Sequence, residues 1–157
     1  MKKNSIFYII DDDFLFNEKR LNEFITLIKE RNINKKYVCY GRADFVSSHP
    51  ELMKQLKEIG FYYILVGLEA IDERYLSDYN KLSDMSCNTK AIQILNDTGI
   101  NIMGMFIVDL DFIAKDFSLL YKWIKRNKLK HTAISILTPE MSSELIEQYR
   151  DRLITDN

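Results

Sequence analysis

Charged side chains follow directly on several apolar runs of this sequence. The run IFYII at residues 6–10 is followed by Asp11, Asp12 and Asp13, and later runs end in Arg42 and Asp44, in Glu69, and in Asp109 and Asp111. A carboxylate that ends a buried strand must find hydrogen-bond donors, and a guanidinium offers a planar fork to a carboxylate ligand. Charges at so many corresponding positions indicate a functional site.

Each of these residues taken singly has a simpler explanation. Acidic residues are common near helix starts, where they meet the positive end of the helix dipole, and most charge clusters are solvated surfaces. Arg42 could pair with a nearby aspartate, an ion pair that contributes little when it is exposed. Glu69 is harder to explain in this way, because it ends the apolar run YYILVGL.

Composition bounds the class of protein. The 157 residues are 46% hydrophobic and 29% charged, which is typical of one globular domain over residues 1–157. The net charge of -1 and the absence of a basic stripe argue against nucleic-acid binding. The apolar run at 102–108 is too short to span a membrane. Cys39 and Cys87 lie far apart in the sequence, so we expect buried thiols, a reducing compartment and a cytoplasmic protein.

The elements that must position these charges alternate between strand and helix. Five β-like runs start near Ile6, Tyr37, Tyr62, Asn101 and His131. Each is followed by a segment with helical spacing, within 17–32, 49–60, 86–99, 116–129 and 142–154. Asn17 and Ser86 are placed to cap helices, Pro50 suits a first helical position, and Gly60 and Gly99 suit helix ends.

Five consecutive βα units predict an α/β fold with a parallel sheet of about five strands. An open doubly wound sheet and an arc of a (β/α) barrel both fit this pattern. Both architectures bind ligands beyond the carboxyl ends of the strands, where the charged residues lie.

Five segments in succession resemble the radical S-adenosylmethionine (SAM) enzymes, and most of all the group that often carries an N-terminal cobalamin-binding domain. The segments are FYIIDDDFLFNEKRLNEFITLI, YVCYGRADF, LKEIGFYYILVGLEAIDERYLSDYNK, AIQILNDTGINIMGMFIV and ISILTPE. No single motif is specific, but their order and spacing match over nearly the whole chain. The resemblance implies a partial (β/α) barrel, of which this chain would be the C-terminal portion.

The resemblance also implies roles for individual residues. Glu69 would accept both ribose hydroxyls of SAM, and Arg42 would bind the carboxylate of its amino acid end. The aspartates at 11–13 would lie near the methionyl group and accept its ammonium or face the substrate. Lys81, in YNK, matches a position near the site, and Leu137, in ISILTP, would border the adenine. No residue is assigned a catalytic role, and the substrate is an unknown small molecule.

The resemblance is incomplete at the metal centre. The family holds a four-iron four-sulfur cluster with three cysteines spaced CxxxCxxC, and this chain has only two cysteines and no such motif. It also has Asp109 where the family usually has glycine. We therefore expect a fragment, inactive alone, of a radical SAM oxidoreductase or methyltransferase, whose cluster ligands and any cobalamin site belong to the parent enzyme.

Two alternatives remain open. A non-catalytic binding or structural domain of the same fold would also lack the cluster motif. A receiver domain of a response regulator is similar in the acidic end of its first strand, YIIDDDF, although this chain has no Lys-Pro dipeptide and has Glu69 where a receiver has its phosphoacceptor aspartate.

The run at residues 6–10 also carries an expectation about assembly. If a preceding strand is absent, this run is an edge of the sheet without internal charge or proline to protect it. We expect self-association of the fragment, most simply as a homodimer.

Overall fold

Five strands form one parallel sheet in the computed structural model, which describes residues 5–69, 85–139 and 145–150. The sheet order is β1-β2-β3-β4-β5. The strands are β1 (Ile6–Tyr8), β2 (Lys36–Arg42), β3 (Phe61–Glu69), β4 (Asn101–Val108) and β5 (His131–Ile136). The helices are α1 (Glu18–Glu30), α2 (Ala43–Ser48), α3 (Pro50–Glu58), α5 (Met85–Thr98), α6 (Ala114–Arg126) and α7 (Leu145–Tyr149).

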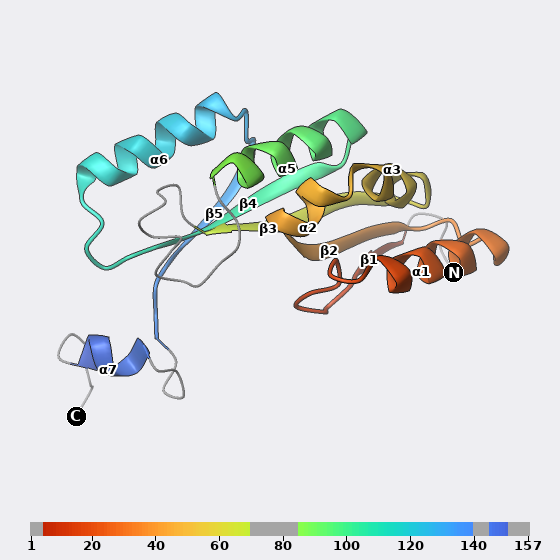
Figure 1. The fold of residues 1–157 in the computed structure, drawn as a ribbon, viewed down its shortest axis with the longest axis horizontal. Helices are drawn as coiled ribbons and strands as arrows, with labels where there is room; N and C mark the ends of the chain where they lie inside the picture. The colour runs from red at the N-terminus through yellow and green to blue at the C-terminus, as the bar shows by residue number, and fades with distance from the viewer. Residues whose placement is uncertain (1–4, 70–84, 140–144, 151–157) are drawn as a thin grey trace.

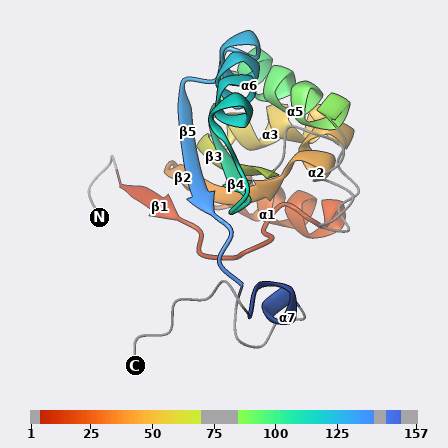
Figure 2. The ribbon, with the colours of Figure 1, turned by 90° about the vertical axis from the view of Figure 1, so that its left-hand side faces the viewer.

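The sheet curls into an arc that is open on one side. Figures 1 and 2 show helices α1, α2, α3, α5 and α6 on the convex side of this arc and β1 and β5 at its two free edges. A doubly wound receiver domain has strand order 2-1-3-4-5 and helices on both faces. The predicted partial (β/α) barrel is therefore confirmed, and the receiver alternative is wrong.

Helix α1 shows how local sequence sets the elements. The side chain of Asn17 accepts a hydrogen bond from the backbone N–H of Arg20 at 3.0 Å, which caps the helix as predicted. Leu21, Ile25 and Ile28 follow at helical spacing and are buried against the sheet.

Two predicted helix ends are also confirmed. Gly60 and Gly99 follow α3 and α5 with φ angles of 112° and 72°, a region that side chains other than glycine rarely adopt. Pro50 is the first residue of α3, where its missing N–H leaves no intrahelical hydrogen bond unmade.

The structure differs from the sequence prediction in three segments. The expected strand at 6–10 is a strand only over Ile6–Tyr8, and its side chains are exposed because no other described strand or helix covers this edge. Helix α2 begins within the segment YVCYGRADF, which had been predicted as a strand. It forms because Ala43 and Val46 bury one face of a short helix. Of the helix expected over 142–154, the described residues contain α7, Leu145–Tyr149.

The core lies between the convex face of the sheet and the helices. Along β4 the side chains alternate, so that Ile102, Phe106 and Val108 are buried while Met103 and Met105 on the concave face are half-buried. No described helix is both long and apolar enough to cross a bilayer.

Candidate functional site

The carboxyl ends of all five strands meet at one edge of the sheet, because the strands are parallel. The predicted charged residues are distributed along this edge in strand order. The aspartates at 11–13 follow β1, Arg42 ends β2, Glu69 ends β3 and Asp109 follows β4.

Asp11 and Asp12 differ in their surroundings, although they are adjacent. Asp11 Oδ2 accepts a hydrogen bond from Nη2 of Arg20 at 2.7 Å, and its Oδ1 accepts from the backbone N–H of Asp13 at 3.2 Å. The hydrogen bond from Arg20 lowers the pKa of Asp11 below its ordinary value. Asp12 is exposed. Asp11 therefore orders the acidic loop through α1, and Asp12 projects into solvent.

Asp13 is the aspartate of this loop that remains unsatisfied. Its Oδ1 is buried and has no hydrogen-bond partner among the described residues. Burial raises the pKa of Asp13, and the positive charge of Arg42 opposes that rise. A buried acceptor without a donor is unfavourable in the protein alone, so this atom is suited to a donor from a ligand.

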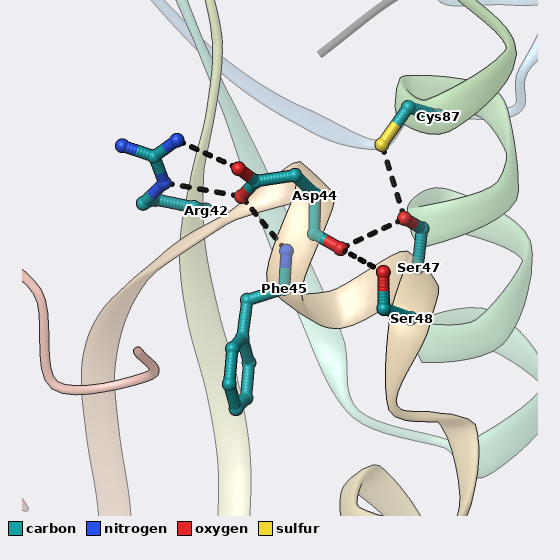
Figure 3. A network of polar contacts seen from close by, with 6 residues as sticks. All are labelled: Arg42, Asp44, Phe45, Ser47, Ser48 and Cys87. Atoms are coloured by element: carbon teal, nitrogen blue, oxygen red, sulfur yellow. Dashed lines mark hydrogen bonds and ion pairs between the residues drawn. The ribbon is translucent and has the colours of Figure 1, made fainter. Parts of the chain in front are cut away.

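Arg42 forms a two-point ion pair with Asp44 at the start of α2 (Figure 3). Its Nε donates to Asp44 Oδ1 at 3.1 Å and its Nη2 donates to Oδ2 at 2.6 Å. The hydrogen bonds from Arg42 lower the pKa of Asp44, and the carboxylate raises the pKa of Arg42. Arg42 therefore makes the ion pair with a nearby aspartate that the sequence allowed as the alternative to ligand binding. It holds the guanidinium in place and leaves Nη1 outside the pair.

Hydrogen bonds in the first turn of α2 hold Asp44 in place. The backbone N–H of Phe45 donates to Asp44 Oδ1 at 2.8 Å, and the hydroxyls of Ser47 and Ser48 donate to the Asp44 carbonyl at 3.0 and 2.8 Å. Ser47 Oγ also lies 3.0 Å from Sγ of Cys87, which connects α2 to α5 (Figure 3). The guanidinium is therefore held by a network that continues into the core.

A pocket of about 350 Å³ opens between the acidic loop and α2. Its lining combines opposite charges with apolar walls and consists of Asp13, Leu15, Phe16, Arg42, Asp44, Phe45 and Ser48. The sequence predicted Asp13 and Arg42 as site residues, but it did not predict Phe16, Phe45 or Ser48. A helical reading of residues 43–48 would have placed Phe45 and Ser48 one turn apart on the same side, next to the end of β2.

Three predicted site residues lie elsewhere along the edge. Glu69 ends β3 at a register shift opposite Phe106, and its side chain lies outside what the structure describes. Lys81 lies outside the described residues. Leu137 continues the edge beyond β5, where its backbone N–H donates to the Val108 carbonyl at 2.8 Å.

The concave face leading up to this edge is apolar and aromatic. Tyr8 and Tyr40 pack edge to face, with ring centroids 5.7 Å apart. Burial, followed by the hydrogen bond with Tyr40, raises the pKa of Tyr8 to about 12. Leu65, Met103 and Met105 extend the face and are half-buried. Figure 2 shows no helix of the described chain on this side of the sheet. The face offers a broad apolar surface beneath a charged rim.

The chain's cysteines do not fit an iron–sulfur cluster. Among the described residues there is no group of three or more histidine, cysteine or acidic side chains that could hold a metal ion. Cys39 is fully buried, and burial raises the pKa of its thiol to about 12, which disfavours the thiolate that iron requires.

Several curated proteins are similar to the chain, although no family model matches it. It is 28% identical over 149 residues to bacteriochlorophyllide d C-8(2)-methyltransferase of Chlorobaculum tepidum, and the aligned region covers 92% of this chain and 32% of the relative. It is 28% identical over 116 residues to hopanoid C-3 methylase of Methylococcus capsulatus, and the aligned region covers 74% of this chain and 22% of the relative. The chain thus spans a third or less of these relatives.

A solved structure shares the fold. TsrM from Kitasatospora setae, a radical S-adenosylmethionine methyltransferase with cobalamin and a four-iron four-sulfur cluster bound, superposes with a TM-score of 0.72 at 13% identity. The match covers 91% of this chain and 30% of that one. The two proteins have the same curled parallel sheet.

Proposed function

This chain is a homologue of the radical SAM enzymes and carries part of their barrel, and from this premise we propose that it forms part of a SAM site. In this proposal, the pocket between the acidic loop and α2 binds the amino acid end of SAM. The chain contributes to a larger enzyme, a methyltransferase or oxidoreductase, whose cluster ligands and any cobalamin site come from other parts of the parent protein.

The pairing of an unsatisfied acceptor with a fixed guanidinium supports this proposal. Asp13 Oδ1 is buried without a donor among the described residues, and it lines the same pocket as Arg42. The amino acid end of SAM carries an ammonium, which donates, and a carboxylate, which accepts. The ammonium suits Asp13, and the carboxylate suits Nη1 of Arg42. Asp44 orients Arg42 for this contact.

The remaining predicted residues fit the rest of the cofactor in strand order. Glu69, at the end of β3, accepts the ribose hydroxyls, and Leu137 borders the adenine beyond β5. In the parent enzyme, bound SAM would supply radical chemistry, provided that a reduced iron–sulfur cluster donates the electron that cleaves it. The residues of this chain bind and orient the cofactor and exclude water from it.

The concave face supports a substrate class. Tyr8, Tyr40, Leu65, Met103 and Met105 make a surface suited to a flat apolar molecule, since methionine and aromatic side chains adapt to such ligands. The two relatives described above are, by name, methylating enzymes of a bacteriochlorophyllide and of a hopanoid. We therefore propose a large apolar ring compound as the substrate of the parent enzyme.

Calorimetric titration of the chain with S-adenosylhomocysteine and with 5′-methylthioadenosine tests the pocket. The first ligand keeps the amino acid end and the second lacks it. Asp13→Asn should weaken S-adenosylhomocysteine binding about 10- to 100-fold, the effect of losing a charge-assisted hydrogen bond, and should leave 5′-methylthioadenosine unchanged. Asp12→Asn is the matched control, because Asp12 is exposed in the same loop. Equal affinities of wild type and Asp13→Asn for S-adenosylhomocysteine would refute the proposed pocket.

A non-catalytic domain of the same fold is the second candidate, favoured by the chain's two cysteines. A CxxxCxxC triplet in the reading frame upstream of Met1 would decide for the enzyme. For either candidate we propose a cytoplasmic location, supported by Cys39 and Cys87, neither of which forms a disulfide.

A further inference from the structure

Asn88 is a fully buried polar residue in the first turn of α5. Its Nδ2 donates to the Leu68 carbonyl at 3.1 Å, while its Oδ1 is buried with no partner among the described residues. An apolar side chain would avoid the unpaired acceptor but would leave the Leu68 carbonyl without this donor. The contact with Leu68 is therefore what an asparagine provides at this position.

Leu68 lies where β3 loses its regular neighbours. The last pair between β2 and β3 joins Arg42 to Gly67, after which the chain of β2 turns into α2. The pairing of β3 with β4 shifts register between Gly67 and Glu69. Asn88 thus supports the backbone of β3 at the irregular step that precedes Glu69.

The side chain of Leu68 is held by packing against β4. Leu68 is 1% exposed, and a Cβ at Gly104 of β4 would lie 2.8 Å from its Cδ1. Gly104 therefore leaves the space that the Leu68 side chain occupies. Packing holds the side chain of Leu68 and a hydrogen bond holds its carbonyl, so the backbone has little freedom at the residue before Glu69.

The first turn of α5 also contacts α2. Sγ of Cys87 lies 3.0 Å from Oγ of Ser47 in α2, the helix that follows Arg42 (Figure 3). Asn88, the next residue of α5, contacts the end of β3, and Glu69 is the last residue of that strand. One helix turn therefore connects the ends of β2 and β3.

We propose that Asn88 is a positioning residue for Glu69 within the proposed function, on which this assignment rests. In that function Glu69 accepts the two ribose hydroxyls of SAM, and Arg42 binds the carboxylate at the other end of the ligand. One carboxylate receives both hydroxyls only when the strand end that carries it is held in place. Asn88 supplies that support through the Leu68 carbonyl and does not itself contact the cofactor.

Titration of the intact chain with 5′-methylthioadenosine and with its 2′,3′-dideoxy analogue tests this role. Neither ligand carries the amino acid end, so the pocket at Asp13 and Arg42 does not contribute to the comparison. The wild type should prefer the hydroxylated ligand about 10- to 100-fold, the effect of hydrogen bonds to a charged acceptor. Asn88→Leu should reduce that preference several-fold and leave the affinity for the dideoxy analogue unchanged.

Thr98→Val is the matched control within α5. Thr98 Oγ1 donates to the Ile94 carbonyl at 2.9 Å, so this variant also loses a hydrogen bond from a side chain to a backbone carbonyl, but at the far end of the helix. It should keep the wild-type preference. Asn88→Ser, whose hydroxyl is too short to reach the Leu68 carbonyl, should behave like Asn88→Leu and replaces it if the leucine variant does not fold.

The outcomes separate this assignment from the proposed function. A wild-type preference in a folded Asn88→Leu or Asn88→Ser protein, verified by its circular dichroism, would overturn the positioning role and leave the proposed function intact. Equal wild-type affinity for the two ligands, or binding of neither, would overturn the role of Glu69 and the role of Asn88 together. A similar loss of preference in Thr98→Val would show a general weakening of α5, and the assignment to Asn88 would fail.

Discussion

The substitution Asp13→Asn should stabilise the folded chain while it weakens ligand binding. Asp13 Oδ1 is buried without a partner among the described residues, and burial is the larger influence on the pKa of this carboxyl. The amide removes the charge that is unfavourable to bury but keeps the shape of the side chain. In the proposed function, a donor from the ligand offsets this unfavourable burial.

The magnitude follows from the partial exposure of the residue. A buried acceptor left unsatisfied costs about 1 to 3 kcal/mol, and the attraction to Arg42 and the solvent contact of the half-buried side chain offset much of this. We expect a net gain of about 0.5 to 1 kcal/mol in the free energy of unfolding for Asp13→Asn. For a chain of this length that corresponds to a rise in melting temperature of about 1 to 4 °C.

The stability that Asp13→Asn gains should increase as the pH rises from acid to neutral. The pKa of Asp13 is raised in the folded chain, so the folded state binds more protons than the unfolded state above the ordinary aspartate pKa of about 4. The contribution of Asp13 to stability therefore falls as the pH rises from about 4 through the raised folded pKa. Asp11, whose pKa is lowered, acts in the opposite sense in both proteins and cancels in the comparison.

Thermal melts of wild type, Asp13→Asn and Asp12→Asn at about pH 7 and about pH 4 provide the assay. The advantage of Asp13→Asn should be present at neutral pH and shrink in acid, and Asp12→Asn should match the wild type at both. A lower melting temperature for Asp13→Asn at neutral pH would show that the carboxylate is a structural partner of Arg42. That result would refute the predicted stabilisation.

Three further predictions concern the scaffold. Gly60→Ala should destabilise the chain by about 3 kcal/mol or more in chemical denaturation, because the new Cβ would collide with the Lys35 carbonyl. Gly99→Ala should cost only about 1 kcal/mol, because φ has the same sign there but the new Cβ would make ordinary van der Waals contact with the Lys57 side chain. Light scattering over a concentration series should show self-association through the uncovered edge at Ile6–Tyr8, and a monomeric mass at high concentration would contradict it. Anaerobic reconstitution of the chain alone should leave it without a four-iron four-sulfur cluster, since it has two cysteines, and stoichiometric iron and sulfide would refute that expectation.

The sequence by itself determined the five strands, most of the helices and their order, but not helix α2. Local signals decide these features, because a helix cap or a glycine with positive φ acts within a few residues of its own position. Asn17 capping α1 and Gly60 and Gly99 ending α3 and α5 are all of this kind. The alternation of apolar strand and amphipathic helix then allows few parallel arrangements, so the charged strand ends were expected to share one edge.

Only the tertiary structure decided which carboxylate oxygens are satisfied and which lack a partner among the described residues. Asp11 and Asp13 are two residues apart and of the same type, yet Arg20 from α1 donates to Asp11, whereas Oδ1 of Asp13 has no donor in the part of the chain that the structure describes. Tyr149 orients Asp109 from 40 residues away, and no periodicity in the sequence predicts that contact. Such pairings depend on the direction of each side chain and on what packs against it, and these are set by the folding of the whole sheet and its helices rather than by any local stretch of sequence.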